Sequence, residues 1–313
     1  MPHAKPDIEN AEFIIFIGTA PGATGNPFRR TGELIAQART DGKVDYVIID
    51  PVLSNADSRA AGERSNWVPI VPGTDSALLM AMMRWMFEHD RHNKAYLSCA
   101  NPEFAESLGF PSYCSASWLV IQDPSHPRYG KYLRGSDIGV ELEAEKRYGD
   151  DDPYIVLNED NEFEAAITLM SPAQLEAPEG LLVNGKDIQL KTALQLLKES
   201  AMRQTIEEAS EYCGIPVEVI EGLADEFSSH GTKASIVSHG GMMSGNGFYN
   251  AFAVVTLNTL IGNLNNKGGF VMGGGGFRDA TAGPRYNLVD FEGKVQPRGI
   301  PIGRNVPFER TSE

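Results

Sequence analysis

Residues 13–51 read FIIFIGTAPGATGNPFRRTGELIAQARTDGKVDYVIIDP. This stretch begins with an apolar run, residues 13–18, that is rich in β-branched and aromatic side chains and ends at a glycine, as a buried parallel strand does. The segment 28–39 carries apolar residues at helical spacing and stops before Gly42, and a second apolar run occupies residues 46–49. This order of strand, helix and strand predicts one βαβ unit with a right-handed crossover.

A third strand and a second helix are expected further along the chain. Residues 67–71 form a short extended run, and Pro72 and Gly73 then precede a segment of helical periodicity. We expect the side chain of Thr74 or Asp75 to cap the first turn of this helix. The apolar positions of the helix are typical of core packing, rather than of a metal or cofactor site. These positions are Leu78, Leu79, Met82, Trp85 and Met86.

The regular alternation of strands and helices stops between about residues 95 and 185. This segment is rich in Pro, Tyr, Gly and Asp, it contains strand-like runs at 118–122 and 154–157, and we interpret it as an irregular insertion. Three helical patterns then follow, near residues 189–201, 205–212 and 216–228.

The order of strand, glycine turn and helix returns after residue 230. Residues 234–238 (ASIVS) predict a short buried strand, His239 and two glycines follow it, and an apolar helix is expected from about 248 to 261. These patterns together predict an α/β fold with a mostly parallel sheet. Residues 271–313 are Gly-rich and show no periodic pattern, so we expect an extended tail there.

Charge and cysteine content exclude several classes of function. The formal net charge of −15 argues against broad binding of nucleic acid or anionic membranes, because both require a positive field. No apolar run approaches the roughly 20 residues of a membrane span, so direct membrane insertion is not expected, and no export signal is visible. Cys99, Cys114 and Cys213 lie outside any CxxC pattern, which argues against a self-contained iron–sulfur or zinc cluster. We expect these three thiols to be structural.

The glycine-rich turn after the first strand is a candidate phosphate site. Residues 18–27 read GTAPGATGNP and lie between a strand and a helix, where open α/β sheets bind phosphates at backbone amides and a helix N-terminus. The turn is neither a GxGxxG fingerprint nor a Walker loop, and this argues against nicotinamide and ATP as ligands.

Three polar residues at strand ends each allow two interpretations. Asp50 could accept hydrogen bonds from a ribose or base, or could belong to a structural turn. Asp75 could cap its helix, or could accept from the N1–H and amino group of a guanine. His239 could face a ligand, or could be buried and hydrogen-bonded within the fold. His239 has no second histidine or carboxylate at metal-ligand spacing.

These segments, in this order, resemble the large subunits of the dimethyl sulfoxide reductase family of molybdopterin oxidoreductases. Residues 16–21 (FIGTAP) are similar to the family's G-x-N-P turn, and residues 47–51 (VIIDP) to its V-x-D-P strand. Residues 67–75 (WVPIVPGTD) resemble the W-x-x-I-R-P-G-T-D signature, and residues 260–269 (LIGNLNNKGG) the L-x-G-N-x-x-x-x-G-G segment. Within the family, the long turn and the insertion look most like those of tetrathionate reductases.

The resemblance implies a Rossmann-like three-layer domain over residues 1–270 that binds one of two molybdopterin guanine dinucleotides. The turn after the first strand would face the pyrophosphate or ribose, Asp50 the guanosine, and Gly73 to Asp75 the guanine, while the second glycine turn would line the inner part of the same arm. Ala20 stands where the family often has asparagine, and Asn26 is a candidate replacement. The implied contacts are Gly18, Thr19, Ala20, Pro21, Asn26, Asp50, Pro51, Pro72, Gly73, Thr74, Asp75, His239, Gly240, Gly241 and Asn246.

The resemblance also implies parts that lie outside this chain. The family's iron–sulfur cysteines and molybdenum ligand would precede it, so we expect an internal piece of a longer enzyme, without catalytic residues or redox activity of its own. The implied partners of the parent enzyme are two subunits, one for iron–sulfur electron transfer and one that anchors the complex in the membrane, on the periplasmic side of the bacterial inner membrane. The implied reaction is the reduction of tetrathionate to thiosulfate.

Three alternatives remain open at this point. The parent enzyme could reduce another sulfur or arsenic oxyanion. The chain could instead be a cofactor-free scaffold module of a respiratory complex. A third possibility is a nucleotide-binding enzyme unrelated to molybdenum, which would bind guanine nucleotides without a pterin.

Overall fold

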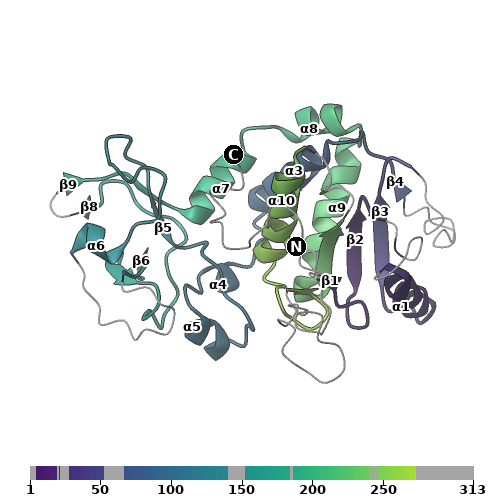
Figure 1. The fold of residues 1–313 in the computed structure, drawn as a ribbon, viewed down its shortest axis with the longest axis horizontal. Helices are drawn as coiled ribbons and strands as arrows, with labels where there is room; N and C mark the ends of the chain where they lie inside the picture. The colour runs from purple at the N-terminus through teal and green to yellow at the C-terminus, as the bar shows by residue number, and fades with distance from the viewer. Residues whose placement is uncertain are drawn as a thin grey trace, which may run out of the picture. The chain divides into compact units, whose positions relative to one another are not determined.

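The computed structural model describes residues 5–19, 21, 28–52, 67–139, 152–183, 186–239, 242 and 245–272. Its centre is a parallel sheet of four strands in the order β11, β2, β3, β4 (Figure 1). The prediction of an α/β fold with a mostly parallel sheet is therefore confirmed. The strands are β2 (Phe13–Ile17), β3 (Asp45–Ile49), β4 (Trp67–Val68) and β11 (Ala234–Ser238).

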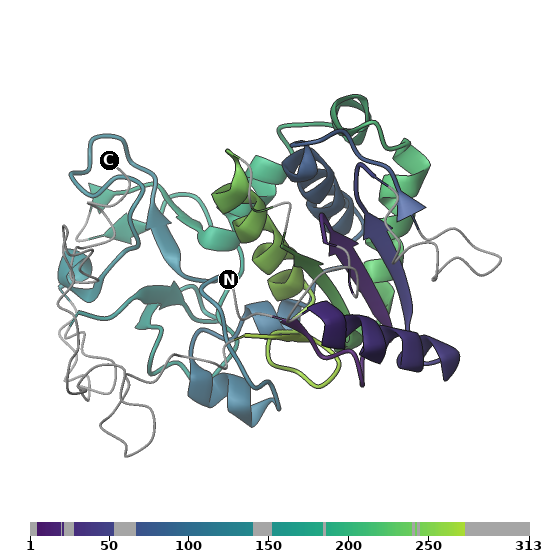
Figure 2. The ribbon, with the colours of Figure 1, turned by 45° about the vertical axis from the view of Figure 1, so that its right-hand side comes forward.

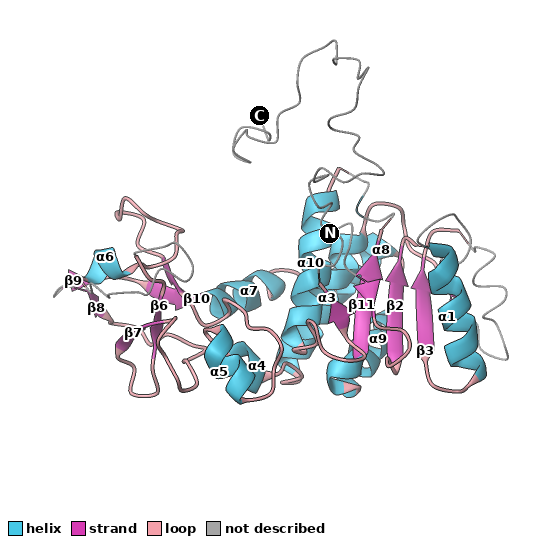
Figure 3. Ribbon diagram, turned by 60° about the horizontal axis from the view of Figure 1, so that its bottom comes forward, coloured by secondary structure: helices cyan, strands magenta, loops and turns pink. Residues whose placement is uncertain are grey.

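Helices cover both faces of this sheet, as Figures 2 and 3 show. Ile14 and Phe16 of β2 pack into the smaller core beneath α1, while Phe13, Ile15 and Ile17 belong to the larger core beneath α3, α9 and α10. Both faces of β2 are buried, which is why its sequence is continuously apolar. The helices are α1 (Phe28–Thr40), α3 (Asp75–Glu88), α8 (Ile206–Cys213), α9 (Val217–Ser229) and α10 (Gly247–Leu260).

The methionine-rich face of α3 packs in the core, as predicted. The side chains of Leu78, Leu79, Met82 and Met86 are fully buried there. Burial of these four side chains contributes about 1.5 to 3 kcal/mol each, so this face stabilises the fold.

The segment predicted as an irregular insertion forms short elements around small apolar cores of its own. Two of its strands coincide with the strand-like runs seen in the sequence. β5 (Leu119–Ile121) pairs antiparallel with β10 (Leu190–Thr192), so the irregular segment continues to Thr192. Its elements are α4 (Lys94–Leu97), α5 (Pro102–Ser107), β5 (Leu119–Ile121), α6 (Gly135–Ile138), β6 (Ile155–Leu157), β7 (Phe163–Ala165), β8 (Leu182–Val183), β9 (Lys186–Asp187) and β10 (Leu190–Thr192).

The prediction of a helix from residue 189 was wrong at its start. Helix α7 (Ala193–Ala201) begins four residues later, because 190–192 pair with β5. The boundary is set by a capping box. The hydroxyl of Thr192 accepts from the Gln195 backbone N–H at 3.1 Å, and Gln195 Oε1 accepts from the Thr192 N–H at 2.8 Å. The motif T-x-x-Q marks such a helix start in the sequence itself.

The side chains of two asparagines hydrogen-bond to backbone groups on the edge of β11 that does not pair with β2. The side chain of Asn258, on α10, accepts from the Ile236 N–H at 3.1 Å and donates to the Ile236 carbonyl at 2.8 Å. Asn263 donates to the Ala234 carbonyl at 2.6 Å and to Asn258 Oδ1 at 2.7 Å. Both asparagines are completely buried. They replace the neighbouring strand that an edge strand lacks.

The amino-terminal strand pairs with the last described one. β1 (Lys5–Pro6) runs antiparallel to β12 (Phe270–Val271). Most of the tail predicted at 271–313 lies beyond residue 272 and so outside the described residues. None of the described helices combines the length and the apolar character that crossing a bilayer requires.

The three cysteines are free thiols, and Cys99 and Cys213 are buried. Burial raises the pKa of Cys99 to about 11 and that of Cys114 to about 12, and it also raises the pKa of Cys213. Thiols with such values stay protonated at neutral pH and are poor nucleophiles and ligands. The geometry therefore agrees with the structural role expected for them.

His230 links the stability of the fold to pH. Its ring lies 2.9 Å from Glu226 and 3.2 Å from Glu12. Burial acts to lower the pKa of His230, but the hydrogen bonds to Glu226 and Glu12 outweigh it, so the pKa is raised. A raised folded-state pKa means that protonated His230 stabilises the fold below its unfolded pKa, and that this contribution is lost as pH rises through the folded value.

We therefore expect His230→Gln to destabilise the chain more at about pH 6 than at about pH 9. Urea denaturation at the two pH values measures this difference. A cost that does not change with pH would show that the two ion pairs contribute nothing to folding.

Candidate functional site

The strand order creates a switch point between β2 and β11. From β2 the chain proceeds through α1 to β3 and β4 on one side, and it later returns to place β11 on the other side of β2. In open α/β sheets, ligands bind at the carboxyl ends of the strands that flank such a switch point. Ile17 and Ser238, the last residues of the two strands, are paired in register, so the turns that follow them leave the same edge.

The turn after β2 starts with a conformation that favours glycine. Gly18 has a φ of 54°, and its N–H donates to the Ile49 carbonyl at 2.8 Å, which joins this turn to the end of β3. Thr19 and Pro21 are buried at the same edge. Ala20 and Asn26, which were predicted to contact a ligand here, lie outside the described residues.

Asp50 forms a structural turn at the end of β3. Its carboxylate accepts from the Val52 N–H at 3.1 Å, and its carbonyl accepts from Trp67 Nε1 at 2.9 Å. Its own N–H donates to the Val68 carbonyl of β4 at 3.3 Å. The turn interpretation of Asp50 is thus observed, and a contact with a guanosine stays a prediction. Pro51, next in the chain, is exposed.

The turn between β4 and α3 is open on its outer side. Gly73 has a φ of 80°, and a Cβ placed on it would meet nothing within 4 Å; Pro72 beside it is also exposed. Thr74 occupies the N-cap position, but its side chain makes no capping hydrogen bond. Its hydroxyl donates to the Val71 carbonyl at 2.7 Å instead. Of the two residues expected to cap this helix, Thr74 does not do so, and Asp75 is the first residue of the helix itself.

Asp75 is a buried carboxylate at the first position of α3, with 7% of its surface exposed. Burial raises its pKa, its own backbone N–H lowers it, and the charge of Asp50 raises it further, so the net pKa lies above the ordinary value. Asn250 of α10 donates to Asp75 Oδ2 at 3.4 Å, and Ser76 donates to Asn250 Oδ1. The starts of α3 and α10 therefore meet at this carboxylate.

Ser238 ends β11 at the same edge, and His239 follows it. Ser238 is buried, yet its hydroxyl makes no hydrogen bond within the described residues. His239 is exposed, so the interpretation of a buried histidine was wrong. Asn246 is exposed at the N-cap of α10, and its carbonyl accepts from the Asn250 N–H at 3.0 Å. Gly240 and Gly241, which belong to the predicted site, lie outside the described residues.

The described residues thus bring four predicted segments to one edge of the sheet. Hydrogen bonds join residue 18 to β3 and residue 50 to β4, the charge of Asp50 acts on Asp75, and Asp75 contacts α10. Among these residues, no group of three or more His, Cys, Asp and Glu side chains is placed to hold a metal ion. A ligand at this edge would meet glycine turns, the buried carboxylate of Asp75 and the hydroxyl of Ser238, which makes no hydrogen bond within the described residues.

A family model described as "Molybdopterin oxidoreductase" matches residues 3–284. The chain belongs to the molybdopterin oxidoreductase family. This confirms the resemblance noted in the sequence.

Several curated relatives of this molybdopterin oxidoreductase are much longer than the chain. The A subunit of tetrathionate reductase from Salmonella typhimurium is 40% identical over 312 residues, which cover 100% of this chain and 30% of that protein. The A subunit of selenate reductase from Mesobacillus selenatarsenatis is 33% identical over 307 residues, covering 95% and 28%. The corresponding tetrathionate reductase protein of Archaeoglobus fulgidus is 33% identical over 275 residues, covering 85% and 22%. The chain spans less than a third of these relatives.

One solved structure, acetylene hydratase from Pelobacter acetylenicus, aligns with a TM-score of 0.48 at 15% identity, over 87% of this chain and 24% of that one.

Sequence reasoning missed three residues at this edge of the molybdopterin oxidoreductase fold, namely Ser76, Ser238 and Asn250. A signal for Asn250 was present, because a polar residue stood within a helix that was interpreted as uniformly apolar. A buried amide in such a helix needs a partner, and here the partners are Asp75 and Ser76. The unused hydroxyl of Ser238 follows from packing and has no counterpart in the sequence pattern.

The residues present fit the guanosine part of a molybdopterin dinucleotide. A guanine offers two adjacent donors, N1–H and the amino group, which suit the two oxygens of a carboxylate such as Asp75. The hydroxyl of Ser238 is buried and without a partner among the described residues, so a polar ligand group could satisfy it. Gly73 leaves room for close approach of a ligand to the backbone, and Gly18 has the positive φ that favours glycine.

Proposed function

We propose that this chain binds one guanine dinucleotide arm of a molybdopterin cofactor within the catalytic subunit of a longer oxidoreductase. The observation that carries the proposal is Asp75, a buried carboxylate at the ligand-binding edge of the sheet, held toward that edge by Asn250. Within the described residues no cation is among the groups that act on the pKa of Asp75, and burying a carboxylate without such a partner is costly. A ligand with two N–H donors would offset that cost when it binds.

The other residues would complete the binding arm. The glycine-rich turn after β2 would lie beside the pyrophosphate, because glycine allows close approach of the backbone. Asp50 would accept from the guanosine while its carboxylate keeps the bond to Val52. Thr74, His239 and Asn246 would line the same arm, and Ser238 would supply a hydroxyl there.

In the parent enzyme, we propose that the substrate is tetrathionate. When bound, the molybdenum centre would supply the two electrons that split tetrathionate into two thiosulfates, and the chain's own residues would bind and orient the cofactor. Two relatives named tetrathionate reductase support this choice. The proposal extends to two partner subunits, one for iron–sulfur electron transfer and one for membrane anchoring, and to a periplasmic location. A second candidate substrate is selenate, because one relative is named selenate reductase.

The test uses the complete catalytic subunit that contains this chain, with a reduced viologen dye as electron donor. We expect kcat/KM for tetrathionate to exceed that for selenate by about tenfold or more. Acid hydrolysis of the purified enzyme should release GMP from the cofactor. Preference for selenate would overturn the substrate, and release of CMP or no nucleotide would overturn the dinucleotide.

A further inference from the structure

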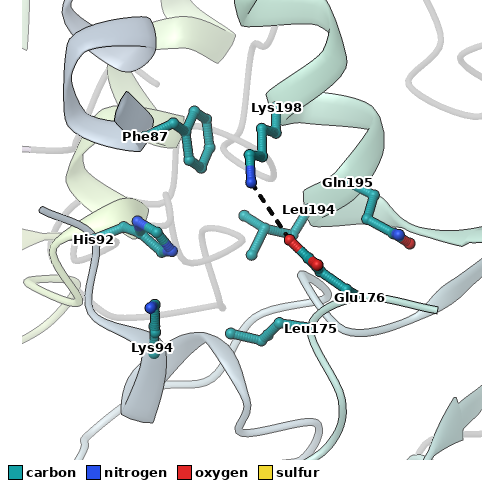
Figure 4. Close-up of a pocket in the computed structure, with 8 residues that line it drawn as sticks. All are labelled: Phe87, His92, Lys94, Leu175, Glu176, Leu194, Gln195 and Lys198. Carbon is teal, nitrogen blue, oxygen red and sulfur yellow. Dashed lines mark hydrogen bonds and ion pairs between the residues drawn. The ribbon is translucent and has the colours of Figure 1, made fainter. Parts of the chain in front are cut away.

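A pocket lies at the other end of α3, away from the edge of the sheet where the dinucleotide is proposed to bind. A pocket of about 260 Å³ opens there between the end of α3, the start of α4, residues 175–176 and α7. Phe87 lies twelve residues after Asp75, roughly 20 Å along the helix, so this pocket is separate from the site proposed above. Its lining residues are Phe87, His92, Lys94, Leu175, Glu176, Leu194, Gln195 and Lys198 (Figure 4).

The walls of the pocket combine an apolar surface with positive charge. Phe87, Leu175 and Leu194 form the apolar part, and Lys94 and Lys198 bring two ammonium groups to the same hollow. Figure 4 shows His92 and Lys94 on one side and Lys198 reaching toward Glu176 on the other. Two lysines at one hollow are notable in a chain of net charge −15, and they favour an anionic ligand.

Both lysines keep hydrogen-bonding capacity for such a ligand. Lys94 Nζ donates to Asp90 at 2.7 Å, and Lys198 Nζ donates to Glu176 at 3.4 Å. The two carboxylates are largely exposed, at 63% and 70% of their side-chain surface. Exposed ion pairs are weak, and an ammonium has three donors. A bound anion can therefore share each lysine with its present partner.

His92 supplies a third donor. Its Nδ1 is buried, lies 3.8 Å from Asp90 Oδ1 and makes no hydrogen bond within the described residues. Burial lowers the pKa of His92; the charge of Asp90 opposes this effect, and the charges of Lys94 and Lys198 add to it. The lowered pKa favours the neutral imidazole at neutral pH. The charges of both pocket lysines already act on this ring. An anion placed between them would favour the protonated, donating form.

We propose that this pocket binds a small organic carboxylate, with the carboxylate group held by Lys94, Lys198 and His92 and the apolar body against Phe87, Leu175 and Leu194. The pocket volume of about 260 Å³ lies just below the usual range for ligand pockets, so the ligand must be small. An inorganic oxyanion would leave the three apolar side chains without a partner. A cation would meet Glu176 as the one lining carboxylate, already paired with Lys198. The proposal does not depend on the cofactor assignment.

The test is isothermal titration calorimetry of the 313-residue chain with benzoate, which joins a carboxylate to a flat apolar ring. Benzamide, the neutral molecule of the same shape, and sulfate, an anion without an apolar part, are the comparison ligands. We expect saturable binding of benzoate and about tenfold weaker binding of the other two. Equal binding of benzamide would overturn recognition of charge, and equal binding of sulfate would overturn the organic class.

Matched variants locate the binding. We expect K94Q/K198Q to weaken benzoate binding about tenfold. The control K43Q/K191Q removes the same charge from two lysines that are also paired with carboxylates, Asp41 and Glu199, but lie outside the pocket. Thermal unfolding by circular dichroism checks that both variants fold. Equal affinity in the two variants, or no saturable binding of benzoate to the unmodified chain, would overturn the proposal.

A spectroscopic readout tests the role of His92 directly. Bound benzoate should raise the pKa of His92, because the added negative charge favours the imidazolium. An NMR pH titration of the His92 ring protons, assigned by their loss in His92→Gln, measures this shift. The pKa of His230, outside the pocket, should not change. A His92 pKa that benzoate leaves unchanged would contradict contact with the carboxylate.

Discussion

Replacing Asn258 with leucine is expected to lower the free energy of unfolding of this chain by about 3 kcal/mol or more, because it leaves the N–H and carbonyl of Ile236 buried and unpaired. Leucine has the same number of side-chain heavy atoms as asparagine, branched at the same carbon, but its methyl groups are bulkier, so crowding at this fully buried position adds to the loss. Asn263, which donates to Asn258 Oδ1, loses a partner as well. Urea denaturation at constant pH measures the loss.

A control on the same helix separates this effect from a general disturbance of α10. The Thr256 hydroxyl donates to the Phe252 carbonyl of its own helix at 2.8 Å and serves no strand. Thr256→Val should therefore change stability by only a few tenths of a kcal/mol up to about 0.5 kcal/mol. Comparable losses in the two variants would show that the contact with β11 contributes nothing specific.

The parallel sheet could be predicted because each of its strands has a recognisable sequence pattern of its own. Residues 13–17 are buried on both faces, and a strand of that kind is continuously apolar. The glycine turn at Gly18 and the helix after it then fix the order of a βαβ unit. The positions of the candidate site residues follow from this order, since parallel strands place their carboxyl ends at one edge.

The misplaced start of α7 has a different physical cause. Residues 190–192 continue an apolar pattern into the helix, so periodicity alone cannot separate them from it. Their conformation is decided by pairing with β5, which lies some 70 residues earlier in the sequence. Thr192 and Gln195 nevertheless carried a local signal in the form of the capping box.

The hydrogen-bond partners of buried asparagines cannot be predicted from the sequence pattern. Asn250 and Asn258 both interrupt the apolar helix α10, and both are buried. Their amides serve different purposes, since one meets Asp75 and the other the edge of β11. Spacing alone shows that each needs a partner, while the partner's identity depends on how α10 packs against α3 and β11.

Asp75→Asn should separate cofactor binding from folding. In the complete catalytic protein, we expect the content of guanine dinucleotide per protein to fall by about ten- to a hundredfold, because one of two acceptor oxygens becomes a donor facing the donors of guanine. Mass spectrometry of acid-released GMP measures the content. The exposed carboxylate Asp225 provides a control, and Asp225→Asn should leave the content unchanged.

The same substitution is expected to stabilise the fold while it weakens cofactor binding. The pKa of Asp75 is raised chiefly by burial, so the ionised carboxylate destabilises the fold as pH rises above the unfolded pKa of about 3.9. Asp75→Asn removes this charge, and the variant of the isolated chain should be at least as stable as the unmodified chain at about pH 7, with the advantage vanishing near about pH 4. A stable variant that no longer holds the dinucleotide would mean that the buried charge is retained for recognition at the expense of stability. Undiminished cofactor content would remove Asp75 from the guanine contact.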